Sequence, residues 1–331
     1  MSAVVRDVTA CLAAIVLAGC SRSTSSETSG RVVVALTIDW EGADVSPGAL
    51  AAIEQVRRGL GDVPLTHFMS SAYFTKESVD PTLVTFIRSA VHKGDELAMH
   101  LHAWRSLAEA SDVEPKVSPS FLTGTDEVLA FDHGDDGFDT DLDAYTVAEL
   151  RLFLRTSRRL LEKTQLPISH TFRAGGYLGT PKVVQAIRDE GYTVDSSAID
   201  HRQLDELEDQ TLPARIRDIW PGVSPASQPW LIPAHGGQIL EMPIAAFVDY
   251  SPAAEIAGVI EAAHARWKSE PGKDVFVVLG FHLETAEDHV GQLGEALANV
   301  RARPEIAESL MFTTIEDAAA QARSNLAAAP E

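Results

Sequence analysis

Cysteine is nearly absent from this 331-residue chain, which has only Cys11 and Cys20, both close to the amino terminus. The rest of the chain offers no thiol pair for an intramolecular disulfide, so we expect its stability to come from a hydrophobic core. Lysine and arginine are also scarce, at 27 residues against 48 acidic ones, and the formal net charge is −21. Because phosphate binding needs clustered cations, this balance argues against a nucleic-acid partner.

The apolar run at residues 11–19 is too short to span a bilayer in a mature protein. It follows Arg6 and ends in Leu-Ala-Gly-Cys20, a pattern typical of bacterial lipoprotein export signals. We expect residues 1–19 to be a signal peptide and Cys20 to carry lipid. The protein would then be a membrane-anchored lipoprotein of the cell envelope, facing the periplasm or the exterior. An ordinary secretory peptide with a chance cysteine is the alternative.

Residues 20–30 add a flexible Ser/Thr-rich tether to the lipidated cysteine, since they hold nothing apolar to bury. From residue 31 to about 325, strand-like and helix-like stretches alternate, which predicts a parallel sheet. Seven or eight strands without a domain break favour one distorted parallel β/α barrel, with an open doubly wound sheet as the alternative. No glycine-rich loop follows the first strand, at residues 32–38, so we expect no nucleotide cofactor.

The expected strands are short, apolar and often β-branched. They lie at residues 32–38, 65–71, 96–100, 169–172, 192–196, 240–244, 275–281 and 310–313. Helices are expected at residues 47–60, 80–92, 146–164 and 180–191, and from residues 252, 286 and 314. The helix at 146–164 opens with Thr146 and Glu149, the spacing of a capping box.

Polar side chains follow five of these strands, at Asp39 with Glu41, His100 with His102, Arg173, Asp195 and His282. In a parallel barrel these strand ends meet at one face, where functional groups collect. Two imidazoles and one carboxylate with open positions suit a catalytic divalent metal such as zinc. A second carboxylate can take a proton from water, and another histidine can protonate a leaving group. The set predicts amide or ester hydrolysis.

The order of these motifs resembles the polysaccharide deacetylase (NodB-homology) family. The resemblance covers about Val32 to Thr314, and its most specific part runs from Phe172-Arg-Ala-Gly-Gly-Tyr177 to Asp195-Ser-Ser197. It implies a distorted β/α barrel that removes acetyl groups, with the help of a metal, from an N-acetylated envelope or extracellular glycan.

The resemblance also implies a metal site made of Glu41, His100 and His102. Glu41 stands where the family has a metal-binding aspartate and is longer by one methylene. The family spaces its two histidines four residues apart, but the fourth residue after His100 is Trp104. His102 must therefore supply the second nitrogen, which is possible if the strand ends at about His100.

Five further residues take catalytic roles by the same resemblance. Asp39 would be the base and Arg173 would orient it. The backbone N–H of Tyr177 would bind the oxyanion. His282 would be the acid, and Asp195 would tune it.

Other features leave alternatives open. Trp40 and Trp104 could stack on sugar rings or belong to the core. The aspartate-rich segment at 132–143 could bind calcium, although a solvated loop over the site is the stronger expectation. Two other functions also remain: a non-catalytic glycan-binding or envelope-assembly lipoprotein on the same barrel, and an amidohydrolase acting on a non-sugar amide.

Overall fold

The computed structural model describes residues 30–125, 128–129 and 134–328. The expected signal peptide, the lipidation site Cys20 and nearly all of the tether lie outside the described residues. Within the described part of the chain, no helix has both the length and the hydrophobicity to cross a membrane.

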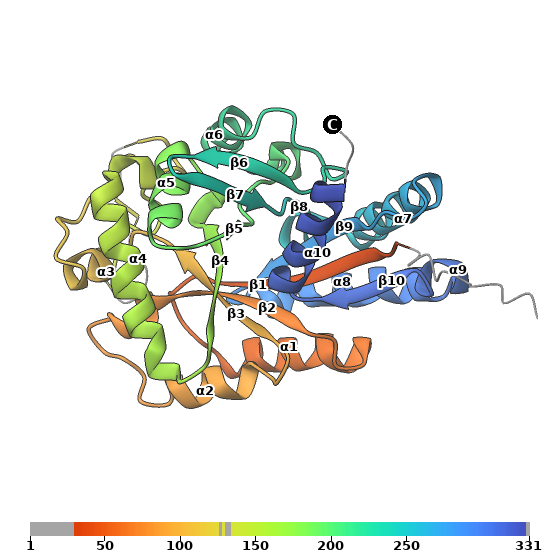
Figure 1. The fold of residues 1–331 in the computed structure, drawn as a ribbon. Coiled ribbons are helices and arrows are strands. Elements are labelled where there is room, and N and C mark those ends of the chain that lie inside the picture. Colours follow the sequence, from red (N-terminus) through yellow and green to blue (C-terminus); the bar gives the residue numbers. More distant parts are fainter. Residues whose placement is uncertain (1–29, 126–127, 130–133, 329–331) are drawn as a thin grey trace, which may run out of the picture.

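Seven parallel strands curl into a distorted barrel (Figure 1). Six of them run in the spatial order β4-β3-β2-β1-β9-β8, and β5 pairs with the outer edge of β4. One parallel bridge between Ile199, just after β5, and Ile244 of β8 joins the two ends of this row. The predicted fold is therefore confirmed. The strands are β1 (Val32–Trp40), β2 (Leu65–Ser70), β3 (Glu96–Leu101), β4 (Ile168–Ala174), β5 (Val194–Asp195), β8 (Ile244–Phe247) and β9 (Val275–His282).

Three more strands extend the sheet. β10 (Leu310–Thr313) pairs with the first half of β1, whose second half pairs with β2. β6 (Trp230–Ala234) and β7 (Gly237–Glu241) form an antiparallel hairpin, and β7 pairs with β5. The single strand expected at residues 240–244 is wrong, because those residues hold the end of β7 and the start of β8. Pro243 lies at the break, where it cannot donate a ladder hydrogen bond.

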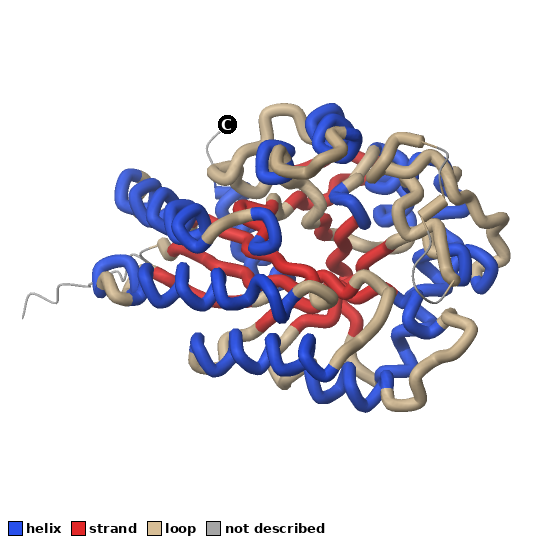
Figure 2. The backbone as a smooth tube through the Cα atoms, turned by 180° about the vertical axis from the view of Figure 1, so that it is seen from behind, coloured by secondary structure: helices blue, strands red, loops and turns tan. Residues whose placement is uncertain are grey.

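Helices pack around the outside of the strands, as Figure 2 shows from behind. Thr146 forms the predicted capping box with Glu149 at the start of α4. The helices are α1 (Pro47–Leu60), α2 (Leu83–Ala90), α3 (Arg105–Ala110), α4 (Val147–Leu161), α5 (Pro181–Asp189), α6 (Thr211–Ile219), α7 (Ala253–Ser269), α8 (Ala286–Arg301), α9 (Pro304–Ala307) and α10 (Ile315–Ala328).

The molecule has two hydrophobic cores, one on each side of the barrel wall. Val34, Leu36 and Ile38 of β1 belong to the outer core with the surrounding helices. Val33 and Ala35 belong to the inner core, which α10 also joins. Because strand side chains alternate, Thr37 and Asp39 continue the inward row. This alternation places the Asp39 carboxylate inside the barrel mouth.

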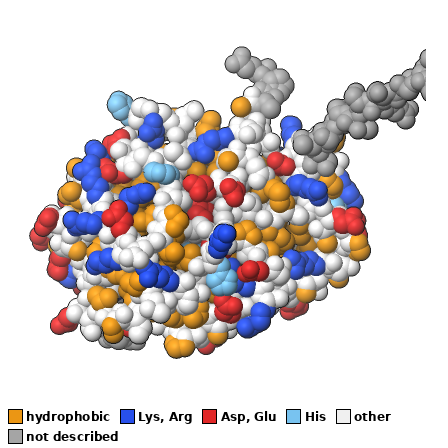
Figure 3. Space-filling view, turned by 60° about the horizontal axis from the view of Figure 1, so that its bottom comes forward, with side chains coloured by type: hydrophobic (Ala, Val, Ile, Leu, Met, Phe, Trp, Pro, Cys, Tyr) orange, Lys and Arg blue, Asp and Glu red, His pale blue; other side chains and the backbone are white. Residues whose placement is uncertain are grey.

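Charged side chains of both signs are interspersed on the face shown in Figure 3. Several basic residues pair with acids on neighbouring helices. Arg151 and Arg155 of α4, for example, both donate to Glu190 at the end of α5, at 2.6 and 2.8 Å. Exposed pairs of this kind each add little stability, about 0–1 kcal/mol.

Candidate metal centre

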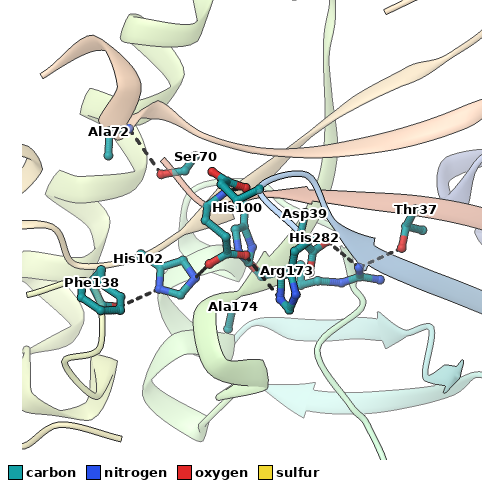
Figure 4. A network of polar contacts seen from close by, with 12 residues as sticks. Thr37, Asp39, Ser70, Ala72, His100, His102, Phe138, Arg173, Ala174 and His282 are labelled. Carbon is teal, nitrogen blue, oxygen red and sulfur yellow. Dashed lines mark hydrogen bonds and ion pairs between the residues drawn. The ribbon is translucent and has the colours of Figure 1, made fainter. Parts of the chain in front are cut away.

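Glu41, His100 and His102 converge at the carboxyl end of the barrel. The Nε2 atom of His102 lies 2.6 Å from Glu41 Oε2, and the Nε2 atom of His100 lies 3.1 Å from Glu41 Oε1. β3 ends at Leu101, one residue before His102. The two imidazole rings consequently meet edge to face with their centroids 4.9 Å apart. Although only one residue separates the two histidines, both of their rings reach the same carboxylate (Figure 4).

Backbone carbonyls fix the orientation of both rings. The Nδ1 of His100 lies 3.0 Å from the carbonyl oxygen of Arg173, and the Nδ1 of His102 lies 2.6 Å from that of Phe138. A carbonyl oxygen only accepts, so each Nδ1 donates a proton to its carbonyl and each Nε2 is the ring nitrogen that faces Glu41. Ligating histidines in metalloproteins are commonly held in this way.

The donor set fits a divalent cation. Two ring nitrogens that face a carboxylate at these distances need positive charge between them and its oxygens, either protons or a metal ion. Burial alone would raise the pKa of Glu41, but the attraction of His102 and His100 outweighs it and lowers this pKa well below its usual range. Glu41, His100 and His102 each offer one ligand atom within 4.8 Å of the others. Three protein ligands with open positions is the arrangement of a catalytic zinc site.

Gly175 makes room for the second histidine. A Cβ atom at this position would lie 2.5–2.7 Å from three atoms of the His102 ring. Contacts this close do not occur between real side chains, so the ring position depends on a glycine here.

Asp39 is held by a buried arginine. The Nη1 of Arg173 donates to Asp39 Oδ1 at 2.6 Å and to the Thr37 hydroxyl at 2.9 Å. Its Nε and Nη2 donate to the backbone oxygen and the hydroxyl of Ser196 at 2.7 and 2.9 Å. Arg173 also lies over the Phe68 ring, with its guanidinium carbon 4.0 Å from the ring centroid. Four hydrogen bonds therefore fix the guanidinium that orients Asp39.

His282 is oriented by Asp249, not by Asp195 as expected. The Nδ1 of His282 lies 3.0 Å from Asp249 Oδ1, and its backbone N–H donates to Asp249 Oδ2 at 3.2 Å. Burial would lower the pKa of His282, but the attraction of Asp249 outweighs it and raises this pKa well above its usual range. The Nε2 of His282 lies 3.7 Å from Glu41 Oε1, so it faces the candidate metal centre.

Asp195 instead supports the barrel wall behind Arg173. Its Oδ1 accepts a hydrogen bond from the Ser197 hydroxyl, and that hydroxyl accepts one from the N–H of Ala174 at 2.9 Å. On the neighbouring strand, Glu241 is paired in register with Asp195 and is equally buried. Burial raises the pKa of Asp195 to about 6, and burial with the repulsion of Asp195 raises that of Glu241. Asp195 therefore stabilises, through Ser197, the backbone of Ala174 beside Arg173.

The structure contradicts sugar stacking by Trp40 and Trp104. Trp40 is fully buried, because it faces outward from β1 into the core beneath the helices. Trp104 is 1% exposed and its N–H donates to the backbone oxygen of Glu41 at 2.9 Å. The Lys76 ammonium lies 3.2 Å from the centroid of a Trp104 ring. Neither ring is open to a sugar, and Trp104 holds the backbone of Glu41 through its hydrogen bond.

Most of the described aspartates in the acidic segment pair with cations. Asp135 bonds to Lys76, and Asp136 accepts two hydrogen bonds from Arg105. Asp141 and Asp143 both accept from one arginine of α6, Arg215. The segment is therefore tied to the body of the protein, and no metal-ligating cluster occurs there among the described residues.

A small pocket of about 130 Å³ lies at the candidate metal centre. Tyr177 and Tyr250 line it. The pocket lining also includes the polar residues Asp39, Glu41, His100, His102 and His282 and the apolar residues Phe121, Leu122, Phe138 and Leu212.

A larger cavity, of about 780 Å³, lies on the other side of the chain that follows Glu41. Ala43 and Tyr73 line it. The Tyr73 hydroxyl donates to Glu284 at 2.5 Å, and the backbone N–H of Glu41 donates to the same carboxylate at 3.2 Å. The Glu284 carboxylate thus connects Tyr73, in the wall of this cavity, to the backbone of Glu41.

Sequence reasoning missed Asp249, Phe121 and Leu212. Asp249 follows a buried strand, which is the signal that identified the other site residues. It was overlooked because the strand was expected to end at residue 244. No local pattern marks Phe121 or Leu212, which reach the pocket from an irregular segment and from the start of α6.

No protein-family model and no curated protein matches the sequence. Several solved structures are similar to this chain. One is a protein assigned as a polysaccharide deacetylase in Mycobacterium smegmatis, with 16% identity, a TM-score of 0.52 and coverage of 89% of this chain and 91% of that one. Another, so assigned in Pseudomonas aeruginosa PAO1, has 12% identity, a TM-score of 0.50 and coverage of 91% and 93%. The allantoinase Puue has 13% identity, a TM-score of 0.52 and coverage of 93% of both chains.

Proposed function

We propose that this protein, which has the fold of polysaccharide deacetylases, is a metal-dependent hydrolase that removes acetyl groups from an N-acetylated glycan of the cell envelope. The observation that carries the proposal is the convergence of two imidazole Nε2 atoms on Glu41, with both Nδ1 atoms committed to carbonyl oxygens. One divalent ion would bind both of these nitrogens and the carboxylate oxygen together.

Glu41, His100 and His102 would hold the metal, for which zinc is the best match to two nitrogens and one oxygen. When bound, such an ion polarises the substrate carbonyl and lowers the pKa of a water molecule. Asp39 accepts the proton of the attacking water. Because Arg173 donates to one of its oxygens at 2.6 Å, the carboxylate is oriented for that task.

His282 supplies the proton to the leaving nitrogen. Asp249 favours the protonated imidazole, so the ring is a competent acid at neutral pH. The backbone N–H of Tyr177 is the proposed donor to the oxyanion. Tyr177 has a positive φ of 64°, which turns its peptide away from the direction of β4.

Acetate release from a defined glycan tests this function. The mature protein, supplied with Zn²⁺, is incubated with chitooligosaccharide and with peptidoglycan, and the released acetate and free amine are both measured. The proposal predicts that the two products form in equal amounts. The double variant His100→Ala, His102→Ala should release neither. Bound metal without acetate release from either glycan would contradict the proposal.

Hydrolysis of a non-sugar amide is the second candidate, because the allantoinase is as similar in fold as the deacetylase from M. smegmatis. The order of the site motifs, which resembles that of polysaccharide deacetylases, favours the glycan. Turnover of small cyclic or linear amides with no release of acetate from glycans would reverse this preference.

We further propose that lipid on Cys20 anchors the protein to a membrane. The support is the Leu-Ala-Gly-Cys20 sequence at the end of an apolar run. Metabolic labelling with a fatty acid should mark the wild type but not Cys20→Ala. Labelling of both, or of neither, would contradict the anchor without affecting the hydrolase.

A further inference from the structure

Glu41 lies one residue beyond the end of β1, at the point where β1 and β9 separate. The pairing of these two strands ends at Asp39 and His282, and the N–H of Leu283 still donates to the backbone oxygen of Asp39 at 2.8 Å. The chain then turns into α8, which begins at Ala286. The N–H of Glu41 accordingly finds its acceptor in a side chain, because a backbone donor away from water needs a partner.

Two side chains bind the two polar groups of this backbone. The N–H of Glu41 donates to both carboxylate oxygens of Glu284, at 3.2 and 3.3 Å. Trp104, just before α3, donates its indole N–H to the carbonyl oxygen of Glu41 at 2.9 Å. The Tyr73 hydroxyl donates to the Glu284 carboxylate and so orients it. The peptide groups on both sides of the Glu41 Cα atom are therefore fixed.

The next residue, Gly42, also restricts this backbone. It has a φ of 90°, which favours glycine. A Cβ atom here would lie 2.6 Å from the Ser70 hydroxyl oxygen and 2.9 Å from the Ala72 Cβ atom. The chain therefore passes so close to the end of β2 that it has little room to shift in that direction.

A fixed backbone makes the place of the Glu41 carboxylate depend on the length of its side chain. Its two oxygens lie 2.6 Å from the Nε2 of His102 and 3.1 Å from that of His100. A metal site tolerates errors of about 0.2 Å in its ligand distances. One carbon–carbon bond spans about 1.5 Å. An aspartate on the same backbone would therefore hold its carboxylate too far from the two imidazoles to share an ion with them.

We propose that Glu284 is a positioning residue for the candidate metal ligand Glu41. Together with Trp104, it holds the Glu41 backbone where a glutamate side chain reaches the ion and an aspartate does not. This inference rests on the proposed metal-dependent hydrolase and names a residue that sets the affinity of its metal site. It gives a role to a carboxylate that belongs neither to the proposed ligands nor to the proposed proton-transfer groups.

The test is a double-mutant cycle on the affinity for Zn²⁺, measured by competition with a fluorescent chelator. Glu284→Ala should weaken binding by about 10–100-fold, the usual effect of losing support for a ligand. Glu41→Asp should weaken it as well. The double variant should lose less than the product of the two losses, because a released backbone lets the aspartate approach the histidines. Glu284→Gln keeps an acceptor for the N–H of Glu41 and should bind Zn²⁺ more tightly than Glu284→Ala.

Glu287→Ala is the matched control, because Glu287 is an exposed glutamate of α8 that does not line the pocket at the metal centre. It should keep the wild-type affinity. A wild type that binds no Zn²⁺ would contradict the metal site, and with it the hydrolase.

Two results would contradict the positioning role and leave the hydrolase standing. One is wild-type affinity in Glu284→Ala, and the other is losses for Glu284→Ala and Glu41→Asp that simply multiply. If Glu284→Ala does not fold, Tyr73→Phe takes its place in the cycle. It removes the hydroxyl that orients Glu284, so it should weaken binding and combine with Glu41→Asp in the same way.

Discussion

At the scale of single residues, Gly175 provides the sharpest test of how His102 reaches the site. The backbone at Gly175 does not have a positive φ, so alanine is compatible with its conformation. The added methyl would overlap the imidazole, which must move away from Glu41. We expect Gly175→Ala to weaken Zn²⁺ binding by about 10–100-fold, the usual effect of losing support for a ligand.

Isothermal titration of the apoprotein with Zn²⁺ would measure that change. Gly258→Ala is the matched control, because Gly258 lies in α7 with no atom within 4 Å of an added Cβ. Equal affinities for Gly175→Ala and Gly258→Ala would mean that the His102 ring does not depend on Gly175.

Asp39 separates catalysis from metal binding. Asp39→Asn keeps the size of the side chain but removes the base, so we expect turnover to fall by about 10²–10⁴-fold. The three proposed ligands are unchanged, and the metal content should be too. Acetate release and elemental analysis of the same preparation measure both. Unchanged turnover would remove Asp39 from the mechanism.

At the scale of structural elements, strand pairing brings two acids together. β5 and β7 place Asp195 beside Glu241 in the barrel wall, where both are fully buried. Their raised pKa values mean that the folded state binds more protons than the unfolded state above about pH 4. The stability of the fold should therefore fall as pH rises from about 4 to about 6 and beyond.

Glu241→Gln should relieve this cost. Its amide oxygen can still accept the hydrogen bond that Ala198 donates to Glu241 at 2.8 Å, but it has no charge to bury. We expect the variant to be more stable than the wild type at pH 8, by about 1–3 kcal/mol, and equal to it near pH 4. Urea denaturation at the two pH values measures the difference. A variant that is less stable at pH 8 would show that both carboxylates are ionised and useful in the native state.

The same strands explain which residues of the site could be predicted from the sequence. The ends of the expected strands identified Asp39, His100, Arg173 and His282. Asp249 escaped because Pro243 divides what reads as one apolar run into two strands, a division that only sheet pairing reveals. The partner of His282 was assigned wrongly for the same reason.

At the scale of the whole molecule, the alternation of strands and helices predicted a parallel sheet, and the number of strands favoured a barrel over an open sheet. The bridge that joins its ends, between Ile199 and Ile244, leaves no local pattern. No local pattern marks Phe121 as a pocket residue either. It lies in an irregular segment whose position is set by long-range contacts with residues 139–141. Long-range closure and loop placement are therefore the parts of this fold that patterning does not encode.

The account depends on one ion shared by Glu41, His100 and His102. Elemental analysis of the tag-free mature protein, with the wild type beside the His100→Ala, His102→Ala variant, tests it directly. We predict about one divalent metal ion per wild-type chain, with zinc foremost, and almost none in a folded double variant. A wild type without metal after exposure to Zn²⁺, or a double variant with equal metal content, would contradict the account.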